Sequence, residues 1–132
     1  MRRGFVVALL LAGCAPKFEP HGSVRIDSVP FEPVKCHVLP SGGIQLYDAV
    51  GQKLELALPP MRLDAFRQIR GTPSVTFLKS GAPGVSVGAC GELVLTGEGY
   101  HGGGRRAASG SVSLDCAGPP RVEARLEFQG CF

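Results

Sequence analysis

Hydrophobic and polar side chains alternate along several short stretches of the chain. The alternation is clearest in Arg121–Phe128, where an apolar residue stands at every second position among arginines and glutamates. Lys53–Leu58 repeats the pattern, and Ser74–Lys79 repeats it less cleanly. Successive side chains of a strand point to opposite faces of its sheet. This period of two therefore predicts strands with one buried face and one face in water.

Turn-forming residues separate these stretches. Segments rich in proline and glycine occur at Pro40–Gly43, Pro59–Pro60, Gly71–Pro73 and Ala117–Pro120, and such residues end strands and build tight turns. With a turn at about every ten residues, we expect about eight short strands in an all-β fold, either an antiparallel β-sandwich or a small barrel.

The stretch 61–70 fits two structures. It follows Pro59–Pro60, and proline is favoured at the start of a helix. Four apolar residues recur in it at helical spacing: Met61, Ala65, Phe66 and Ile69. The alternation of Met61, Leu63 and Ala65 suits a strand as well. We expect one short helix at 61–70 that covers the core.

The first residues have the order of a secretory signal. Met1, Arg2 and Arg3 are followed by an apolar run that ends at Leu11, and a basic start before a short apolar segment is typical of such signals. The run is about ten residues long, whereas a membrane-spanning helix needs about 20. We therefore expect this segment to direct export and not to remain as a transmembrane helix.

The end of this run, Leu11-Ala12-Gly13-Cys14, resembles the lipobox of bacterial lipoproteins at all four positions. The resemblance implies cleavage before Cys14 and a diacylglyceryl group on its sulfur. Residues 1–13 would be the signal peptide, 14–23 the lipidated cysteine and a tether, and 24–132 a single β domain. Ala15 stands where an aspartate retains many lipoproteins at the inner membrane, so the resemblance favours the outer membrane. A plain signal peptide cut elsewhere is the alternative.

Composition limits the remaining choices. The chain has 132 residues, enough for one domain, and a formal net charge of +3. Removal of Arg2 and Arg3 with the signal peptide would leave 12 basic and 11 acidic residues, a balance of +1. Such a small charge implies no nucleic-acid partner.

The cysteines after Cys14 are an even number: Cys36, Cys90, Cys116 and Cys131. In a small exported domain this favours two disulfides over a metal site, and the chain has no C-x-x-C pair. Four cysteines allow three pairings. Cys90 and Cys116 each lie thirteen residues from Gly103, the centre of a glycine-rich connection, so they could face each other across a hairpin. Cys90 is out of phase with Leu93, so this pairing needs an irregular strand end. Our hypothesis is Cys90 with Cys116 and Cys36 with Cys131.

The segment Gly97–Arg106 is the most unusual candidate for a binding site. Its glycines would let backbone amides approach an anion, and two arginines could pair with a phosphate or carboxylate. It matches no phosphate-loop motif, and a hairpin loop with solvated arginines is the simpler alternative. If the loop binds a partner, the side chains we expect to contact it are Tyr100, His101, Arg105 and Arg106.

The residues offer little for catalysis. His21, His37 and His101 fall in the predicted tether, a predicted strand and the loop, and no hydrolase or metalloprotease motif surrounds them. Cys36 next to His37 would point to the opposite side of a strand, and a sulfur in a disulfide cannot act as a nucleophile. We expect no enzyme, no cofactor and no metal site.

Over residues 90–131 the spacing of cysteines, serines and glycines resembles small cystine-linked β-domain lipoproteins of high-GC bacteria, most of which have no assigned function. The leading hypothesis is therefore a membrane-anchored envelope lipoprotein that serves as a structural or interaction subunit with an envelope protein as partner. The alternative is an anchored ligand-binding or enzyme-inhibitor module that uses Gly97–Arg106, and a hydrolase with an unrecognised site is the third. A filled sandwich core would favour the first, and a barrel closed around a ligand cavity of more than a few hundred cubic ångströms the second.

Overall fold

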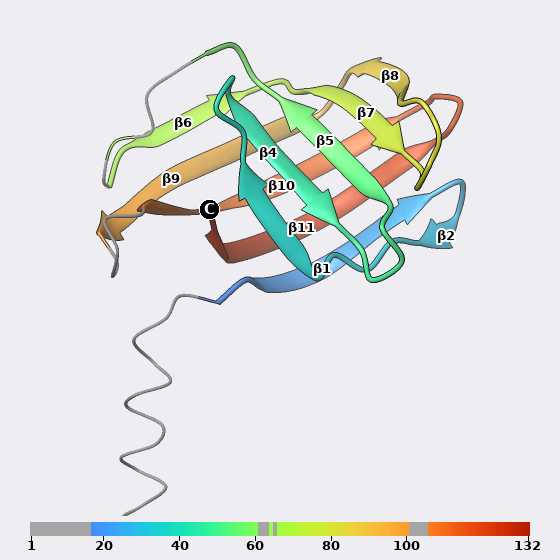
Figure 1. The fold of residues 1–132 in the computed structure, drawn as a ribbon. Coiled ribbons are helices and arrows are strands. Elements are labelled where there is room, and N and C mark those ends of the chain that lie inside the picture. Colours follow the sequence, from blue (N-terminus) through green and yellow to red (C-terminus); the bar gives the residue numbers. More distant parts are fainter. Residues whose placement is uncertain (1–16, 61–63, 65, 101–105) are drawn as a thin grey trace, which may run out of the picture.

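The chain folds into two antiparallel sheets packed face to face, a β-sandwich and not a closed barrel. The computed structural model describes residues 17–60, 64, 66–100 and 106–132. In Figure 1 a sheet containing β4 and β5 lies in front of a sheet containing β9, β10 and β11, and the strands of the two layers cross. The all-β fold and the sandwich are therefore confirmed.

The first sheet has six strands in the order β2-β1-β11-β10-β9-β6. All neighbouring strands are antiparallel, so β1, β10 and β6 run in one direction and β11 and β9 in the other. The strands are β1 (Glu19–Ile26), β2 (Val29–Pro30), β6 (Gln68–Gly71), β9 (Glu92–Tyr100), β10 (Arg106–Cys116) and β11 (Val122–Cys131).

The second sheet has five strands in the order β3-β4-β5-β7-β8. Two hairpins join β3, β4 and β5, and β7 pairs with β5 after the chain has crossed to the first sheet to form β6. The strands are β3 (Lys35–Val38), β4 (Gly43–Tyr47), β5 (Lys53–Ala57), β7 (Ser74–Leu78) and β8 (Val85–Ala89).

A continuous hydrophobic core fills the space between the sheets. The alternation predicted for 121–128 and 53–58 is observed, since alternate residues of β11 and β5 are buried. Leu54 and Leu56 from one sheet meet a core that includes Leu93 and Leu114 from the other. A hollow of about 30 Å³ lies at the edge of this core, beside Leu58. The buried hydrophobic side chains of this core are at most 8% exposed.

The helix predicted at 61–70 is wrong for the residues that the structure describes. Gln68–Gly71 forms β6, which pairs with β9, and Phe66 has a backbone φ of 62°, outside the helical region. Ile69 packs against the core while Phe66 is 82% exposed. The apolar residues of this stretch fit the period of a helix and also that of a strand. The edge of β9 favours the strand because it offers main-chain hydrogen-bond partners. A helix of this length is marginal in water without such tertiary contacts.

The tether predicted for 14–23 is too long. Residues 19–23 belong to β1, which pairs with β11 from Glu19 onward, and the Phe18 ring lies 6.2 Å from the ring of Phe128. Pro20 and Gly22 made this segment resemble a linker. A proline is tolerated there because β2 pairs only with Arg25 and Ile26, which leaves the first part of β1 at the edge of the sheet. In the described residues the strands number eleven, against about eight predicted.

Both disulfides of the hypothesis are present, and each joins an edge of the second sheet to the first. Cys36 in β3 bonds to Cys131 in β11, and Cys90, directly after β8, bonds to Cys116 at the end of β10. The irregular strand end that the second pairing required is at Gly91, whose φ is 78°. The two edge strands β3 and β8 are thus covalently fixed to the opposite layer.

Candidate functional site

A pocket of about 640 Å³ opens at one end of the sandwich. This is the end at which β1 and β10 finish, and we call it the end pocket. β1 has eight residues and so spans about 26 Å. The pocket therefore lies about that far from the opposite end, where β1 begins at Glu19, which we call the Glu19 end.

The walls of the end pocket are mostly apolar. They come from the β1–β2 turn, the β7–β8 hairpin and the β10–β11 loop. The apolar lining residues are Ile26, Val29, Pro30, Phe31, Phe77, Ala82, Pro83, Val85, Pro119 and Pro120. Proline has a fixed φ, so the four prolines make much of this wall stiff before any ligand arrives.

Three polar side chains also line the pocket, and two of them are already engaged. The Asp27 carboxylate accepts the main-chain N–H of Arg121 at 2.8 Å, and the Gln52 amide donates to Asp48 at 2.7 Å. Lys79, just after β7, is exposed, and its ammonium has no ion pair or hydrogen bond among the described residues. The pocket thus offers an apolar surface with an available cation at one wall.

This lining suits the binding of an apolar group. The titratable side chains among the residues that line the pocket are Asp27 and Lys79. The volume lies within the range of about 300–1,000 Å³ typical of ligand pockets. Val29 and Val85 at its rim are 63% and 47% exposed. Such exposure of large aliphatic side chains in one hollow is typical of a contact surface.

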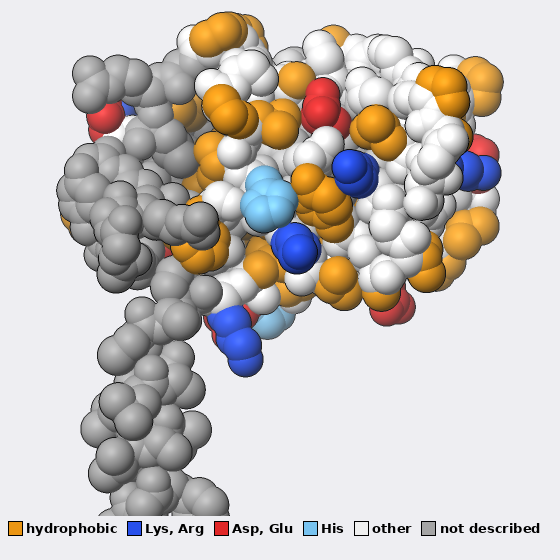
Figure 2. Space-filling view, viewed as in Figure 1, with side chains coloured by type: hydrophobic (Ala, Val, Ile, Leu, Met, Phe, Trp, Pro, Cys, Tyr) orange, Lys and Arg blue, Asp and Glu red, His pale blue; other side chains and the backbone are white. Residues whose placement is uncertain are grey.

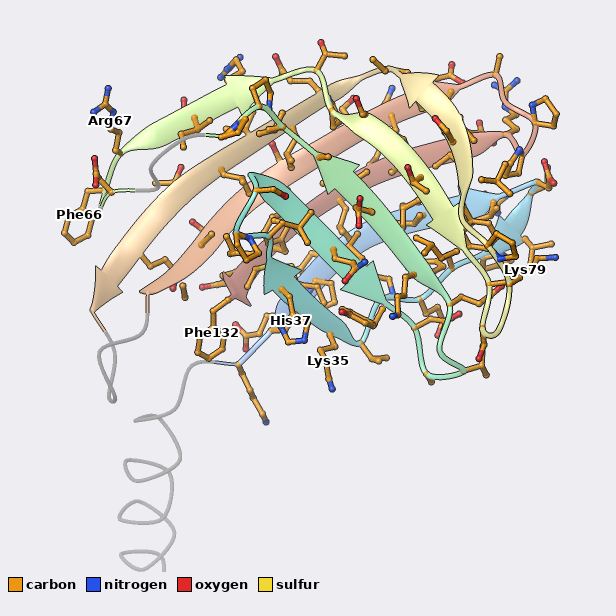
Figure 3. The ribbon with its side chains drawn as sticks, turned by 45° about the horizontal axis from the view of Figure 1, so that its top comes forward. Lys35, His37, Phe66, Arg67, Lys79 and Phe132 are labelled. Carbon is orange, nitrogen blue, oxygen red and sulfur yellow. A yellow bond between two sulfur atoms is a disulfide. The ribbon has the colours of Figure 1, made fainter. Side chains whose placement is uncertain are left out.

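The outer face of the second sheet has a separate cluster of basic and aromatic side chains. The Tyr47 ring lies edge-on to His37, with ring centroids 5.1 Å apart, and the Lys53 ammonium lies 5.4 Å from the Tyr47 centroid. His37 Nδ1 is 3.0 Å from the main-chain oxygen of Phe132. Figure 2 shows blue and pale-blue side chains around an orange patch on this face, and Figure 3 places Lys35 beside His37. His37, Tyr47 and Lys53 thus contact one another, and His37 also contacts the last residue of the chain.

The structure describes only part of the binding segment predicted at Gly97–Arg106. The loop predicted for Gly97–Arg106 is shorter than expected, because Gly97–Tyr100 belongs to β9 and Arg106 begins β10, paired with Tyr100. The side chains of Tyr100 and Arg106 are outside the described part. His101, Arg105 and Cys14 lie outside the described residues altogether.

The end pocket was not predicted from the sequence. Pro83 and Pro119–Pro120 stood out only as turn formers. The sequence does show three turns rich in proline and aliphatic residues. Whether these turns lie at the same end of the sandwich depends on the order of the strands, which the sequence does not give.

The chain matches no protein-family model, no curated protein and no solved structure. Within the described ranges, no helix is long and apolar enough to cross a membrane. The same ranges contain no cluster of three or more histidine, cysteine, aspartate or glutamate side chains placed to hold a metal ion.

Proposed function

We propose that this chain is a lipoprotein of the bacterial cell envelope, anchored through lipid on Cys14 and most consistent with the outer membrane. It acts without catalysis, as an interaction subunit whose end pocket holds an apolar segment of a partner envelope protein. The observation that carries the proposal is the end pocket itself, a stiff apolar hollow about 26 Å from the end at which the chain enters the domain.

The cysteines support the anchor. Two disulfides use Cys36, Cys90, Cys116 and Cys131, which are four of the five cysteines in the chain. Cys14 is the one cysteine of the sequence that these two disulfides do not use. Stable disulfides form in oxidising compartments such as the periplasm, which agrees with export.

The position of the end pocket supports a partner that binds on the side of the domain away from the membrane. Lys17 is the first described residue, and the three residues from Cys14 to Lys17 span at most about 11 Å. A lipid on Cys14 would therefore hold the Glu19 end close to the bilayer, and the end pocket lies at the opposite end of β1.

The anchor is tested by expressing the full chain with its leader in a bacterium supplied with a labelled fatty acid. We expect label in the wild-type chain and partition into the detergent phase, and loss of both in Cys14→Ser. A mature chain that begins elsewhere, or that carries no fatty acid, would contradict the proposal.

The pocket is tested by placing a photo-crosslinking amino acid at Val85 in the anchored chain. Val34 is the matched control, since it is also an exposed valine, 57% exposed, but lies outside the pocket lining. We expect one defined product from position 85, none from position 34, and loss of the product when Val29 is changed to Asp. Val29 is exposed, so this change should alter stability by less than about 0.5 kcal/mol.

The products distinguish the hypotheses. A single envelope protein crosslinked at position 85 supports the interaction subunit. A small molecule bound there would instead favour the ligand-binding module. The same product from positions 85 and 34, or a product that persists in Val29→Asp, would refute the pocket as the contact site.

A further inference from the structure

We propose that the Glu19 end of the domain rests on the lipid surface, with the Phe66 side chain inserted among the headgroups. This inference rests on the proposed lipid anchor and adds an orientation and a second membrane contact to it.

Sheet topology places Phe66 at the Glu19 end. β1 and β6 run in the same direction, so residues just before Gln68 and just before Glu19 lie at the same end of the first sheet. The pairing register supports this, because Gln68 is opposite Thr96 and Glu19 is opposite Gln129. β1 and β6 are separated by three strands, which corresponds to about 19 Å across the sheet.

The backbone holds Phe66 outward. Its side chain is 82% exposed, more than the other large hydrophobic side chains exposed in the described part of the chain. Its N–H donates to the Gly97 carbonyl at 2.6 Å, and the Gly97 N–H donates to the Arg67 carbonyl at 3.0 Å. Figure 3 shows Phe66 and Arg67 projecting from the end of β6, away from the core.

The conformation of Phe66 is one that bulky residues rarely adopt. Its φ of 62° lies in the left-handed region, where an aromatic side chain is an outlier. Such outliers persist only where the surrounding structure maintains them, and they concentrate at functional sites. Here two main-chain hydrogen bonds with β9 maintain a conformation that presents an aromatic ring to solvent. An anchored domain would present that ring to the bilayer.

The neighbouring group suits a lipid headgroup region. The Arg67 side chain is 72% exposed and forms a long pair with Asp64, at 3.8 Å. An aromatic ring flanked by a basic residue is typical of side chains at membrane interfaces. A protein contact next to the lipid anchor would also limit rotation of the domain on the membrane.

The test uses the absence of tryptophan from the chain. Phe66→Trp and Val50→Trp each introduce a single tryptophan at a highly exposed position. Val50 is 72% exposed and lies in the β4–β5 turn next to Gln52, which lines the end pocket. The lipid-anchored full chain is reconstituted in vesicles of phosphatidylethanolamine and phosphatidylglycerol, with and without brominated acyl chains.

We expect the emission of Phe66→Trp to shift to the blue in vesicles and to lose intensity with brominated lipid, because an interfacial tryptophan lies next to the acyl chains. Val50→Trp should keep the emission and intensity of a tryptophan in water. An unshifted, unquenched Phe66→Trp, or equal quenching at both positions, would overturn the inference. If Phe66→Trp fails to fold, Arg67→Trp is the second reporter, with the same expected results.

The result can be separated from failure of the anchor. Mass spectrometry of the same sample first determines whether Cys14 carries lipid. If it carries none, the proposed function and this inference both fail. If Cys14 is lipidated and the tryptophan at position 66 remains in water, only this inference fails.

Discussion

Removal of the Cys36–Cys131 disulfide should destabilise the domain more than removal of Cys90–Cys116. The perturbation is a pair of double variants, Cys36→Ala with Cys131→Ala and Cys90→Ala with Cys116→Ala. The bonds close loops of very different length, with sequence separations of 95 and 26 residues. A longer loop restricts the unfolded chain more, so its crosslink stabilises the folded state more.

The loop lengths set the magnitude. In the chain-entropy model the two bonds contribute about 4.7 and about 3.5 kcal/mol at 25 °C, so the double variants should differ by about 1.2 kcal/mol. A domain of this size is stable by about 5–15 kcal/mol, so the Cys36–Cys131 variant should lose a large share of its stability. The structure adds a local effect, since Cys36 ties the four-residue edge strand β3 to β11. The amides of β3 should therefore lose the most protection from hydrogen exchange.

The assay is urea unfolding followed by far-ultraviolet circular dichroism, in a Cys14→Ser background that needs no detergent. With an m-value of about 1–2 kcal/mol/M, the midpoints of the two variants should differ by about 0.6–1.2 M. Reductant added to the Cys90→Ala, Cys116→Ala variant cleaves the remaining bond but leaves its sulfurs in the core, which separates the crosslink from side-chain volume. Equal midpoints, or a lower midpoint for the Cys90–Cys116 variant, would refute the reasoning from loop length.

Three further predictions concern the fold that positions the end pocket, all measured as changes in the free energy of unfolding. Leu54 is fully buried in β5, the central strand of the second sheet, and Leu54→Ala should cost about 2–5 kcal/mol. Leu78→Ala at the half-exposed end of β7 should cost clearly less, and equal losses would contradict the described core. Gly110→Ala should cost at least about 1–3 kcal/mol, because a Cβ there would collide with the Val94 carbonyl oxygen of the neighbouring strand; an unchanged midpoint would show that the register of β9 and β10 is wrong. Asp27→Ala should cost about 1–2 kcal/mol, because the Asp27 carboxylate accepts a main-chain N–H of the β10–β11 loop. Asp27→Asn should cost less, because asparagine tolerates the φ of 50° at this position and its side-chain oxygen can still accept that hydrogen bond.

Local pattern determined the strands wherever one face of the strand is buried. Arg121–Phe128 alternates because β11 packs its apolar side against the second sheet and leaves its charged side in water. The even number of cysteines and the hairpin geometry also indicated the correct pairing, because Cys90 and Cys116 lie next to the ends of adjacent strands. The alternation of a strand and the number and spacing of the cysteines can both be recognised in the sequence without knowledge of the strand order.

Edge positions were harder to predict because their local preferences are weak. Residues 19–23 contain Pro20 and Gly22, and they form a strand only because β11 is available as a partner. Phe66 and Ile69 belong to the helical pattern of 61–70, but pairing with the edge of β9 places Gln68–Gly71 in a strand. In both cases the strand forms through hydrogen bonds to a partner strand that is distant in the sequence. The local pattern of apolar and polar residues carries no information about that partner.

The sequence by itself indicated an all-β domain with paired cysteines, and its first residues resemble a lipoprotein signal. Tertiary structure alone decided where a partner could bind, because the end pocket is assembled from turns that are separated along the chain and meet only through strand order and direction. The same is true of the Glu19 end, where β1 and β6 bring Lys17 and Phe66 to one end of a sheet. Such surfaces arise from the relative placement of strands, and the side chains that line them follow no period that could be recognised in advance.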